Sequence, residues 1–318
     1  MASIDHDQMR FMTKVARMYH EEGKRQQVIA DELHITQSKV SRMLRRAVRD
    51  GIVQTVVNVP AGVHTDLEAK LEHAYGLRQA LVVDGGGSPA DLRQALGSAT
   101  AAHMATTLAP SDVVGFSSWS STLHAAIDAF PRHTNVTVKS VVQVVGGTGV
   151  SAVQEQANSV LARFARMTDA EAVYFPAPAI MESQAAVESL LSDRSLGSIA
   201  DAWQQMTVIY FGIATLEPSA FFRQSGFAPT PEKLGELASL GVVGDICLKY
   251  FDAHGSIVDC DLNGRVAGVS VDLLQNIDRR VAVAGGLRKI SAIRAALEGN
   301  WVNTLVTDVE TATLLLSN

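Results

Sequence analysis

The chain has little of what would assign it to several large classes of protein. Its 318 residues include only two cysteines, Cys247 and Cys260, which have neither CxxC spacing nor a nearby histidine pair. This argues against a disulfide framework and against a zinc site. The sequence has no run of about 18 apolar residues, and residues 1–8 lack a basic stretch followed by an apolar one, so neither a membrane span nor a secretion signal is expected. We expect a cytoplasmic protein with no membrane partner, no metal and no cofactor.

Charged residues are also scarce, at 19%, whereas apolar residues make up 47% of the chain. This balance excludes disorder and a coiled-coil composition, and the length suggests two globular domains of roughly 150 residues each. Residues 1–60 carry ten basic against seven acidic residues, a net charge of +3, while the remaining 258 carry 17 against 26, a net charge of −9. A small basic head on an acidic body is typical of a DNA-binding module joined to another domain, although chance scatter could also give +3.

The basic head has the spacing of a helix-turn-helix. Residues 7–22 are predicted to form a first helix that Gly23 ends, and residues 26–46 a short helix, a tight turn and a second helix. Small Ala30 permits the last two helices to cross closely. His34 occupies the turn position usually given to glycine, so a left-handed or strained backbone is expected there. The apolar positions expected between the helices are Ile29, Leu33, Ile35, Val40 and Met43.

The second helix of this motif supplies the candidate DNA-reading residues. Gly51 would end it before a β-branched strand at residues 52–59 that begins a wing. The alternative, a solvated basic helix in a bundle, has no need of the close crossing, the turn and the wing together. We therefore predict a winged helix-turn-helix domain at residues 1–60 that binds double-stranded operator DNA. Its candidate contacts are Thr36, which is also placed to cap the helix, and Gln37, Ser38, Lys39, Ser41, Arg42 and Arg45.

Residues 61–78 are predicted to form a linker helix, with a capping box at Thr65–Glu68 and its end at Gly76. From residue 79 to 318, short β-branched runs alternate with alanine-rich helical stretches. This pattern predicts an α/β domain with a mostly parallel sheet covered by helices. The expected strands lie at residues 80–83, 113–114, 136–145, 172–175, 207–212, 281–284 and 304–306.

The loops that follow strands are the candidate ligand site, because ligands bind at the carboxyl ends of the strands in such a sheet. One loop is rich in hydroxyls ahead of a helix expected to begin at Leu123, which is a natural cradle for a phosphate. Helix capping alone would also explain these serines. Trp119 in the same loop could stack on a sugar or belong to the core. The candidates in this loop are Ser117, Ser118, Trp119, Ser120, Ser121 and Thr122.

Three other loops add candidates. Gly146, Gly147 and Thr148 would bring backbone close to a ligand, but a lone glycine pair is weak evidence. Asp245 follows a flexible glycine, where its carboxylate could accept hydrogen bonds from sugar hydroxyls or merely cap a turn. Lys289 follows a glycine pair on an expected first helical turn, which would attract an anion unless the lysine is an ordinary surface residue.

Together these motifs resemble the bacterial SorC/DeoR-type sugar-binding transcriptional regulators over nearly the whole chain. The resemblance rests on residues 26–46, 117–122, 141–147, 174–179, 243–247, 283–286 and 302–308. It implies a fold similar to that of sugar-phosphate isomerases and deaminases, a sugar, sugar phosphate or related effector, and a homo-oligomer that is a dimer or tetramer. It also implies that the serine/threonine loop and Lys289 hold a phosphate, while Gly147, Thr148 and Asp245 face the sugar.

The first loop departs from the family pattern, since many members have a tryptophan-glycine pair and one residue fewer there. An unphosphorylated polyol therefore stays open as the effector. The motifs predict an effector-responsive DNA-binding regulator of carbohydrate or polyol genes, repressor or activator, with no catalytic residue. An active isomerase or deaminase with a DNA-binding appendage would need a base such as Asp245 and usually a nearby histidine, but His254 lies beyond the next expected strand. A scaffold without a ligand is a third possibility.

Overall fold

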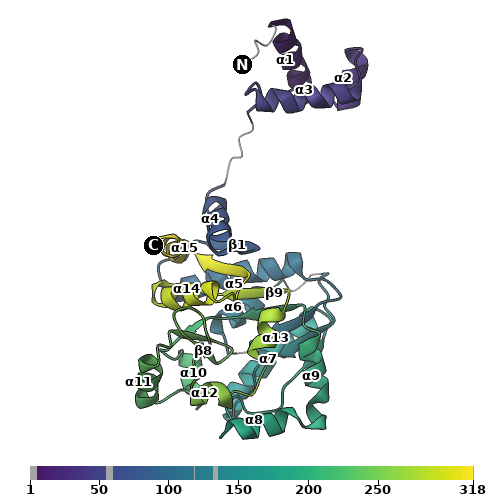
Figure 1. Cartoon of the computed structure of the whole chain (residues 1–318). Helices are drawn as coiled ribbons and strands as arrows, with labels where there is room; N and C mark the ends of the chain where they lie inside the picture. The colour runs from purple at the N-terminus through teal and green to yellow at the C-terminus, as the bar shows by residue number, and fades with distance from the viewer. Residues whose placement is uncertain (1–5, 55–59, 118, 132–134, 318) are drawn as a thin grey trace. The chain divides into compact units, whose positions relative to one another are not determined.

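The computed structural model describes residues 6–54, 60–117, 119–131 and 135–317. The chain divides into two compact units, Met1–Val59 and Pro60–Asn318, called unit 1 and unit 2 below (Figure 1). Each unit has its own hydrophobic core and is described by itself. Among the described residues, no helix is both long and apolar enough to cross a membrane.

The described part of unit 1 contains the helices α1 (His6–His20), α2 (Gln26–Glu32) and α3 (Gln37–Arg49). Met12, Ile29 and Val40, one from each helix, are buried in its core. His34 in the turn between α2 and α3 has a left-handed backbone with φ of 52°, as predicted. The helix-turn-helix is therefore confirmed in its helices. The predicted wing is not, because residues 52–54 contain no strand and residues 55–59 lie outside the described residues.

Unit 2 is built around a parallel sheet with the strand order β1-β10-β9-β5-β2-β3-β4. Successive side chains of a strand point to opposite faces, so Val113 and Val114 are both buried but belong to different core clusters. This confirms the predicted parallel α/β domain, with β3 shorter than expected. The strands are β1 (Gln79–Val83), β2 (Val113–Phe116), β3 (Ser140–Gln143), β4 (Glu171–Val173), β5 (Val208–Phe211), β9 (Arg279–Val283) and β10 (Thr304–Asp308).

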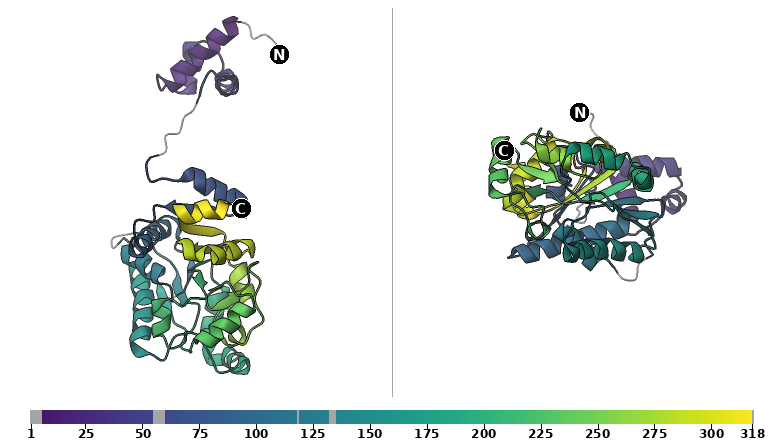
Figure 2. Two further views of the ribbon diagram at one scale, coloured as in Figure 1. Left: turned by 90° about the vertical axis from the view of Figure 1, so that its left-hand side faces the viewer. Right: turned by 90° about the horizontal axis from the view of Figure 1, so that it is seen from below.

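Helices cover both faces of this sheet (Figure 2). One face packs against α5 (Pro89–Thr107), α6 (Ser121–Ala129) and α7 (Ser151–Met167). The other packs against α9 (Gly197–Gln204), α13 (Val271–Asn276), α14 (Ile290–Glu298) and α15 (Val309–Leu316). Beyond these layers lie α8 (Gln184–Leu191), α10 (Ala220–Gln224), α11 (Pro231–Ser239) and α12 (Asp261–Arg265).

A small antiparallel sheet stands beside the parallel one and was not predicted from the sequence. It consists of β6 (Ala214–Thr215), β7 (Gly244–Ile246) and β8 (Lys249–Phe251) in that order. The turn between β7 and β8 places Cys247 and Leu248 at φ of 52° and 63°. Bulky residues rarely adopt a left-handed backbone, so this hairpin holds two strained positions.

Helix α4 (Thr65–Tyr75) lies along the edge strand β1 and ends at Gly76, whose φ of 64° fits the predicted glycine stop. The predicted capping box is wrong, because His64 is the N-cap residue and makes no side-chain capping bond. Glu68 and Glu72 instead accept hydrogen bonds from the backbone N–H groups of Val82 and Ala80, each at 2.9 Å. These carboxylates satisfy donors that an edge strand would leave unpaired.

Candidate functional site

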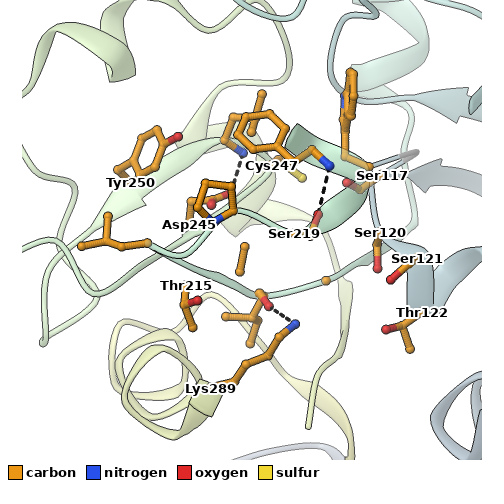
Figure 3. A pocket seen from close by; sticks show the side chains of 18 of the residues that line it. Ser117, Ser120, Ser121, Thr122, Thr215, Ser219, Asp245, Cys247, Tyr250 and Lys289 are labelled. Carbon is orange, nitrogen blue, oxygen red and sulfur yellow. Dashed lines mark hydrogen bonds between the residues drawn. The ribbon is translucent and has the colours of Figure 1, made fainter. Parts of the chain in front are cut away.

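A cavity lies between the carboxyl end of the parallel sheet and the small antiparallel sheet (Figure 3). Its volume of about 100 Å³ is several times what one water molecule needs, so it has room for a small organic ligand. The walls come from five places in the sequence: the loop before α6 with the first turn of that helix, the segment from β5 to α10, the start of α11, the β7–β8 hairpin, and the residue before α14. The polar lining residues are Ser117, Ser120, Ser121, Thr122, Thr215, Ser219, Asp245, Tyr250 and Lys289.

The hydroxyl-rich loop reaches the cavity through the first turn of α6. This helix begins at Ser121, two residues earlier than predicted, and is capped by Ser120 Oγ, which accepts from the N–H of Leu123 at 3.4 Å. Ser121 and Thr122 therefore present both their hydroxyls and first-turn backbone N–H groups, which have no partner within a helix. The predicted candidate Ser118 lies outside the described residues. The described part of the loop keeps the character of an anion-binding helix terminus.

Lys289 supplies the cation of the cavity. It is the N-cap residue of α14, and its Nζ donates a hydrogen bond to the carbonyl oxygen of Ile213 at 2.7 Å. Burial lowers the pKa of the Lys289 ammonium, and the negative charge of Asp245 opposes that shift. The lysine is thus not an ordinary surface residue, because its ammonium is held beside the cavity with donors left for a ligand (Figure 3).

Asp245 is the acidic residue of the lining, and it lies on strand β7 rather than in the loop that the sequence suggested. Its Oδ2 accepts a hydrogen bond from the N–H of Leu248 at 3.0 Å, which fastens the strained hairpin. Burial raises the pKa of Asp245 to about 6, against the opposing effects of the Leu248 bond and of Lys289. The cavity therefore brings together an acidic and a basic side chain, two groups suited to hydroxyls and anions respectively.

An apolar wall faces these polar groups. Trp119 donates its indole N–H to the carbonyl oxygen of Gly146 at 3.1 Å and packs edge-on against Phe222, with ring centroids 6.1 Å apart. Cys247 is buried in the same wall, hydrogen-bonded to Ser117, and burial raises the pKa of its thiol to about 12. The thiol therefore stays protonated and acts as a small apolar lining group.

The structure does not bring the predicted glycine loop to this cavity. Gly147 and Thr148 line a separate hollow on α7, where the N–H of Thr148 donates to Gln154 Oε1 at 2.6 Å. Gly146 touches the cavity wall only through its carbonyl oxygen, which accepts from Trp119. The loop is drawn away because Gly147 forms a bridge with Pro178. The structure therefore does not bring Gly147 and Thr148 together with Asp245.

Several lining residues were missed by the sequence analysis. Thr215, Ser219 and Tyr250 belong to β6, the cap of α10 and β8, which are too short to give a clear periodic pattern. A second depression, called the crevice below, opens beside the cavity and shares Ser121, Thr122 and Lys289 with it. Its other walls are the loops after β1 and β9, the amino-terminal half of α5, and the point where β10 passes directly into α15. Its lining includes Asp84, Arg93 and Asp308. In the sequence, the run of three glycines at 85–87 was a signal from which this crevice could have been predicted.

In unit 1, α3 presents the predicted DNA-reading residues. Thr36 caps the helix by accepting from the N–H of Lys39 at 3.3 Å, as predicted, and Ser41 is half-buried. The neighbouring Arg46 is already paired with Asp50 at 3.0 Å. No ion pair within 4.0 Å is seen for Lys39, Arg42 or Arg45 in the described part of the chain. The exposed side chains on this face are Gln37, Ser38, Lys39, Arg42 and Arg45.

Comparison with known proteins covers both units. Residues 60–317 match the family model described as "Putative sugar-binding domain". The chain is 32% identical over 320 residues to the deoxyribonucleoside regulator of Bacillus subtilis, covering 99% of this chain and 100% of that one. It is 30% identical over 305 residues to the erythritol catabolism regulatory protein EryD of Brucella abortus, covering 95% of each chain. The structure of the full-length sorbitol operon regulator SorC of Klebsiella pneumoniae superposes with a TM-score of 0.72 at 27% identity, over 98% of this chain and 100% of that one.

Proposed function

From the premise that the chain belongs to the SorC/DeoR family of sugar-binding transcriptional regulators, we propose that it controls genes for the breakdown of a sugar or polyol in response to that compound or its phosphate. Relatives are named for deoxyribonucleosides, sorbitol and erythritol, so the family serves small polyhydroxylated metabolites of several kinds. The relatives are named as regulators and not as enzymes.

The cavity of unit 2 is the proposed effector site. The observation that carries this assignment is that Ser121 and Thr122 at the start of α6, Lys289 and Asp245 converge on one cavity (Figure 3). Ser121, Thr122 and Lys289 suit a phosphate or another anionic group, and Asp245 suits sugar hydroxyls. Ser117 and Ser120 complete the polar side, and Trp119 supplies an apolar wall against a sugar face.

An isomerase or deaminase activity is the competing assignment, and the cavity favours it less. Such chemistry needs a base and usually a histidine to open the sugar ring, yet no histidine is among the described residues that line the cavity. Turnover of pentose or hexose phosphates that disappears in Asp245→Asn would establish the enzyme.

Unit 1 is the proposed DNA reader, with residues 1–60 as the DNA-binding domain, 61–78 as the linker and 79–318 as the effector domain. Exposed Gln37, Ser38, Arg42 and Arg45 at the start and outer face of α3 are placed to contact base edges or phosphates, and Thr36, Lys39 and Ser41 to support them. We further propose a homo-oligomer, a dimer or tetramer, whose symmetry requires inverted half-sites in the operator.

A thermal-shift panel tests this proposal. The full chain is heated with sorbitol, erythritol and 2-deoxyribose and with sorbitol 6-phosphate, erythritol 4-phosphate and 2-deoxyribose 5-phosphate. A ligand present at 100 times its Kd stabilises the folded protein by about 2.7 kcal/mol, which is readily detected. We expect one of these compounds to raise Tm in the wild type but not in a Ser121→Ala, Thr122→Ala double variant. A shift of equal size in both proteins would remove the start of α6 from the site.

A further inference from the structure

The chain joins unit 2 at a segment, residues 60–64, that touches the wall of the crevice. The His64 Nε2 atom lies 2.9 Å from Asp84 Oδ1. Gly62 approaches the same carboxylate from the other side, since a Cβ on that glycine would lie 3.5 Å from Asp84 Oδ2. This segment is called the junction below. It precedes α4 and follows directly on the chain that leads to unit 1.

Helix α4, which follows the junction, is fixed to unit 2 by several independent contacts. Glu68 and Glu72 accept from the N–H groups of Val82 and Ala80 on the edge strand β1. Near the end of the helix, the Tyr75 hydroxyl donates to the carbonyl oxygen of Leu315 at 2.7 Å. The helix body therefore moves with the sheet, whereas among the described residues the side-chain contact that holds the junction is the His64–Asp84 pair.

Asp84 contacts the junction and also lines the crevice. It follows β1 directly and lines the crevice together with Ser121, Thr122 and Lys289, the residues that the crevice shares with the cavity. A ligand that extends from the cavity into the crevice therefore meets the same carboxylate that His64 contacts.

We propose that Asp84 transmits effector occupancy to the junction: a ligand hydroxyl that donates to its carboxylate replaces His64 and releases residues 60–64. This inference rests on the proposed function, because it takes the cavity and the crevice as the effector site. The Asp84 side chain is 70% exposed, so its pair with His64 is weak and exchanges readily. A single exposed pair limits the change in DNA affinity carried by this route to about fivefold.

The test measures the coupling between effector and DNA in the full-length protein. The DNA is a duplex selected by the wild type from a random-sequence pool, and the probes are sorbitol 6-phosphate, erythritol 4-phosphate and 2-deoxyribose 5-phosphate. Coupling is the ratio of the DNA Kd with and without probe. We expect His64→Ala to reduce this ratio by about three- to fivefold while the Kd for the probe changes less than about twofold. Asp84→Asn should lower the coupling similarly and also weaken probe binding.

A matched control is Asp278→Asn, which breaks the exposed Arg78–Asp278 pair of 2.7 Å next to the start of β1, away from the crevice lining. It should leave the coupling at the wild-type value. Wild-type coupling in His64→Ala would overturn the inference even if the probe binds, whereas the proposed function would stand. If no probe shifts the wild type, the choice of effector fails, and amide exchange of residues 61–66 decides. Faster exchange in His64→Ala than in Asp278→Asn supports the inference, and equal exchange overturns it.

Discussion

The two units place their charged groups in opposite settings. On α3 of unit 1 the cations Lys39, Arg42 and Arg45 are exposed and lie apart from acidic partners in the described part of the chain. In unit 2, Lys289 and Asp245 are drawn into a small cavity where burial shifts the pKa of each. Exposed cations attract any polyanion and their attraction falls with salt, whereas a buried pair discriminates by geometry.

This contrast suggests separate tasks for the two sets of charges. The α3 face suits a long, uniformly charged partner whose sequence is read by a few side chains. The cavity suits one small molecule that offers both donors and acceptors, because unmatched polar groups inside it would lose their hydrogen bonds. Substitutions in unit 1 should therefore leave effector binding unchanged, and substitutions in unit 2 should leave the DNA affinity without effector unchanged. The predictions below test this from the largest expected effect to the smallest.

Lys289→Ala should have the largest effect. It leaves the Asp245 carboxylate without the neighbouring cation and removes the ammonium that would hold an anionic group. We expect a phosphorylated effector to bind about 30- to 100-fold more weakly, or about 2–3 kcal/mol, by calorimetric titration. DNA affinity without effector should stay at the wild-type value. The matched control is Lys139→Ala, which removes an exposed lysine that donates to Gln205 at 2.8 Å and lines neither the cavity nor the crevice. An unchanged dose response in Lys289→Ala would refute the phosphate assignment.

Arg42→Ala should weaken binding to the selected duplex by about 1–2 kcal/mol, or about 5- to 30-fold, because one contact to a base edge or phosphate is lost. Fluorescence anisotropy at several salt concentrations measures this. The control is Arg46→Ala, whose guanidinium is already engaged by Asp50 and should contribute less. Effector-induced stabilisation should persist in both variants. Its loss in Arg42→Ala would show that the two units are not separable in this way.

The pH dependence of stability should contain a contribution from Asp245. Its folded-state pKa of about 6 exceeds the ordinary value, so the folded protein holds this proton more tightly than the unfolded chain does. The stabilising contribution is present at low pH and is lost as pH rises through about 6. Between pH 5 and 7 the wild type should lose about 1 kcal/mol that Asp245→Asn retains, measured by urea unfolding. Parallel pH profiles in the two proteins would contradict the assignment.

The smallest effect is expected from His34→Gly in unit 1. Glycine adopts the left-handed backbone at this turn without steric cost, but it also gains freedom in the unfolded chain. The two effects nearly offset, which leaves a stabilisation of about 0.5 kcal/mol. Hydrogen exchange of α2 and α3 amides should slow by about twofold, with no change at α14. Faster exchange would mean that the His34 side chain stabilises the turn.

The fold could be predicted where side-chain periodicity is strong. The five inner strands of the parallel sheet are buried on both faces and appear as β-branched runs, and the α2–α3 crossing is marked by Ala30 and the left-handed His34. The small sheet escaped prediction because β6 has two residues and β7 and β8 three each, too few to show a period of two. The capping box failed because the edge of β1, which competes for Glu68, is invisible in the local sequence.

The site was partly predictable for a similar reason. The rule that ligands meet the carboxyl ends of strands located the α6 loop and Lys289 on one cavity. It misplaced Gly147 and Thr148, because the chain after β3 turns to bridge Pro178, a tertiary contact with no local signature. Asp245 was found for the wrong reason, on a strand and not in a loop, and the role of Asp84 depends on a contact with His64 twenty residues earlier.

The indole of Trp119 gives this molecule an optical property that needs no label. All three tryptophans lie in unit 2, and Trp119 alone among them lines the cavity, packed against Phe222 with its N–H on the carbonyl oxygen of Gly146. A compound entering the cavity changes the polarity around that ring, and the emission of the native protein then shifts in wavelength. Metabolites could thus be screened by the intrinsic fluorescence of the unmodified chain. A DNA duplex in the same cuvette would leave the emission of Trp119 unchanged unless DNA binding alters the cavity.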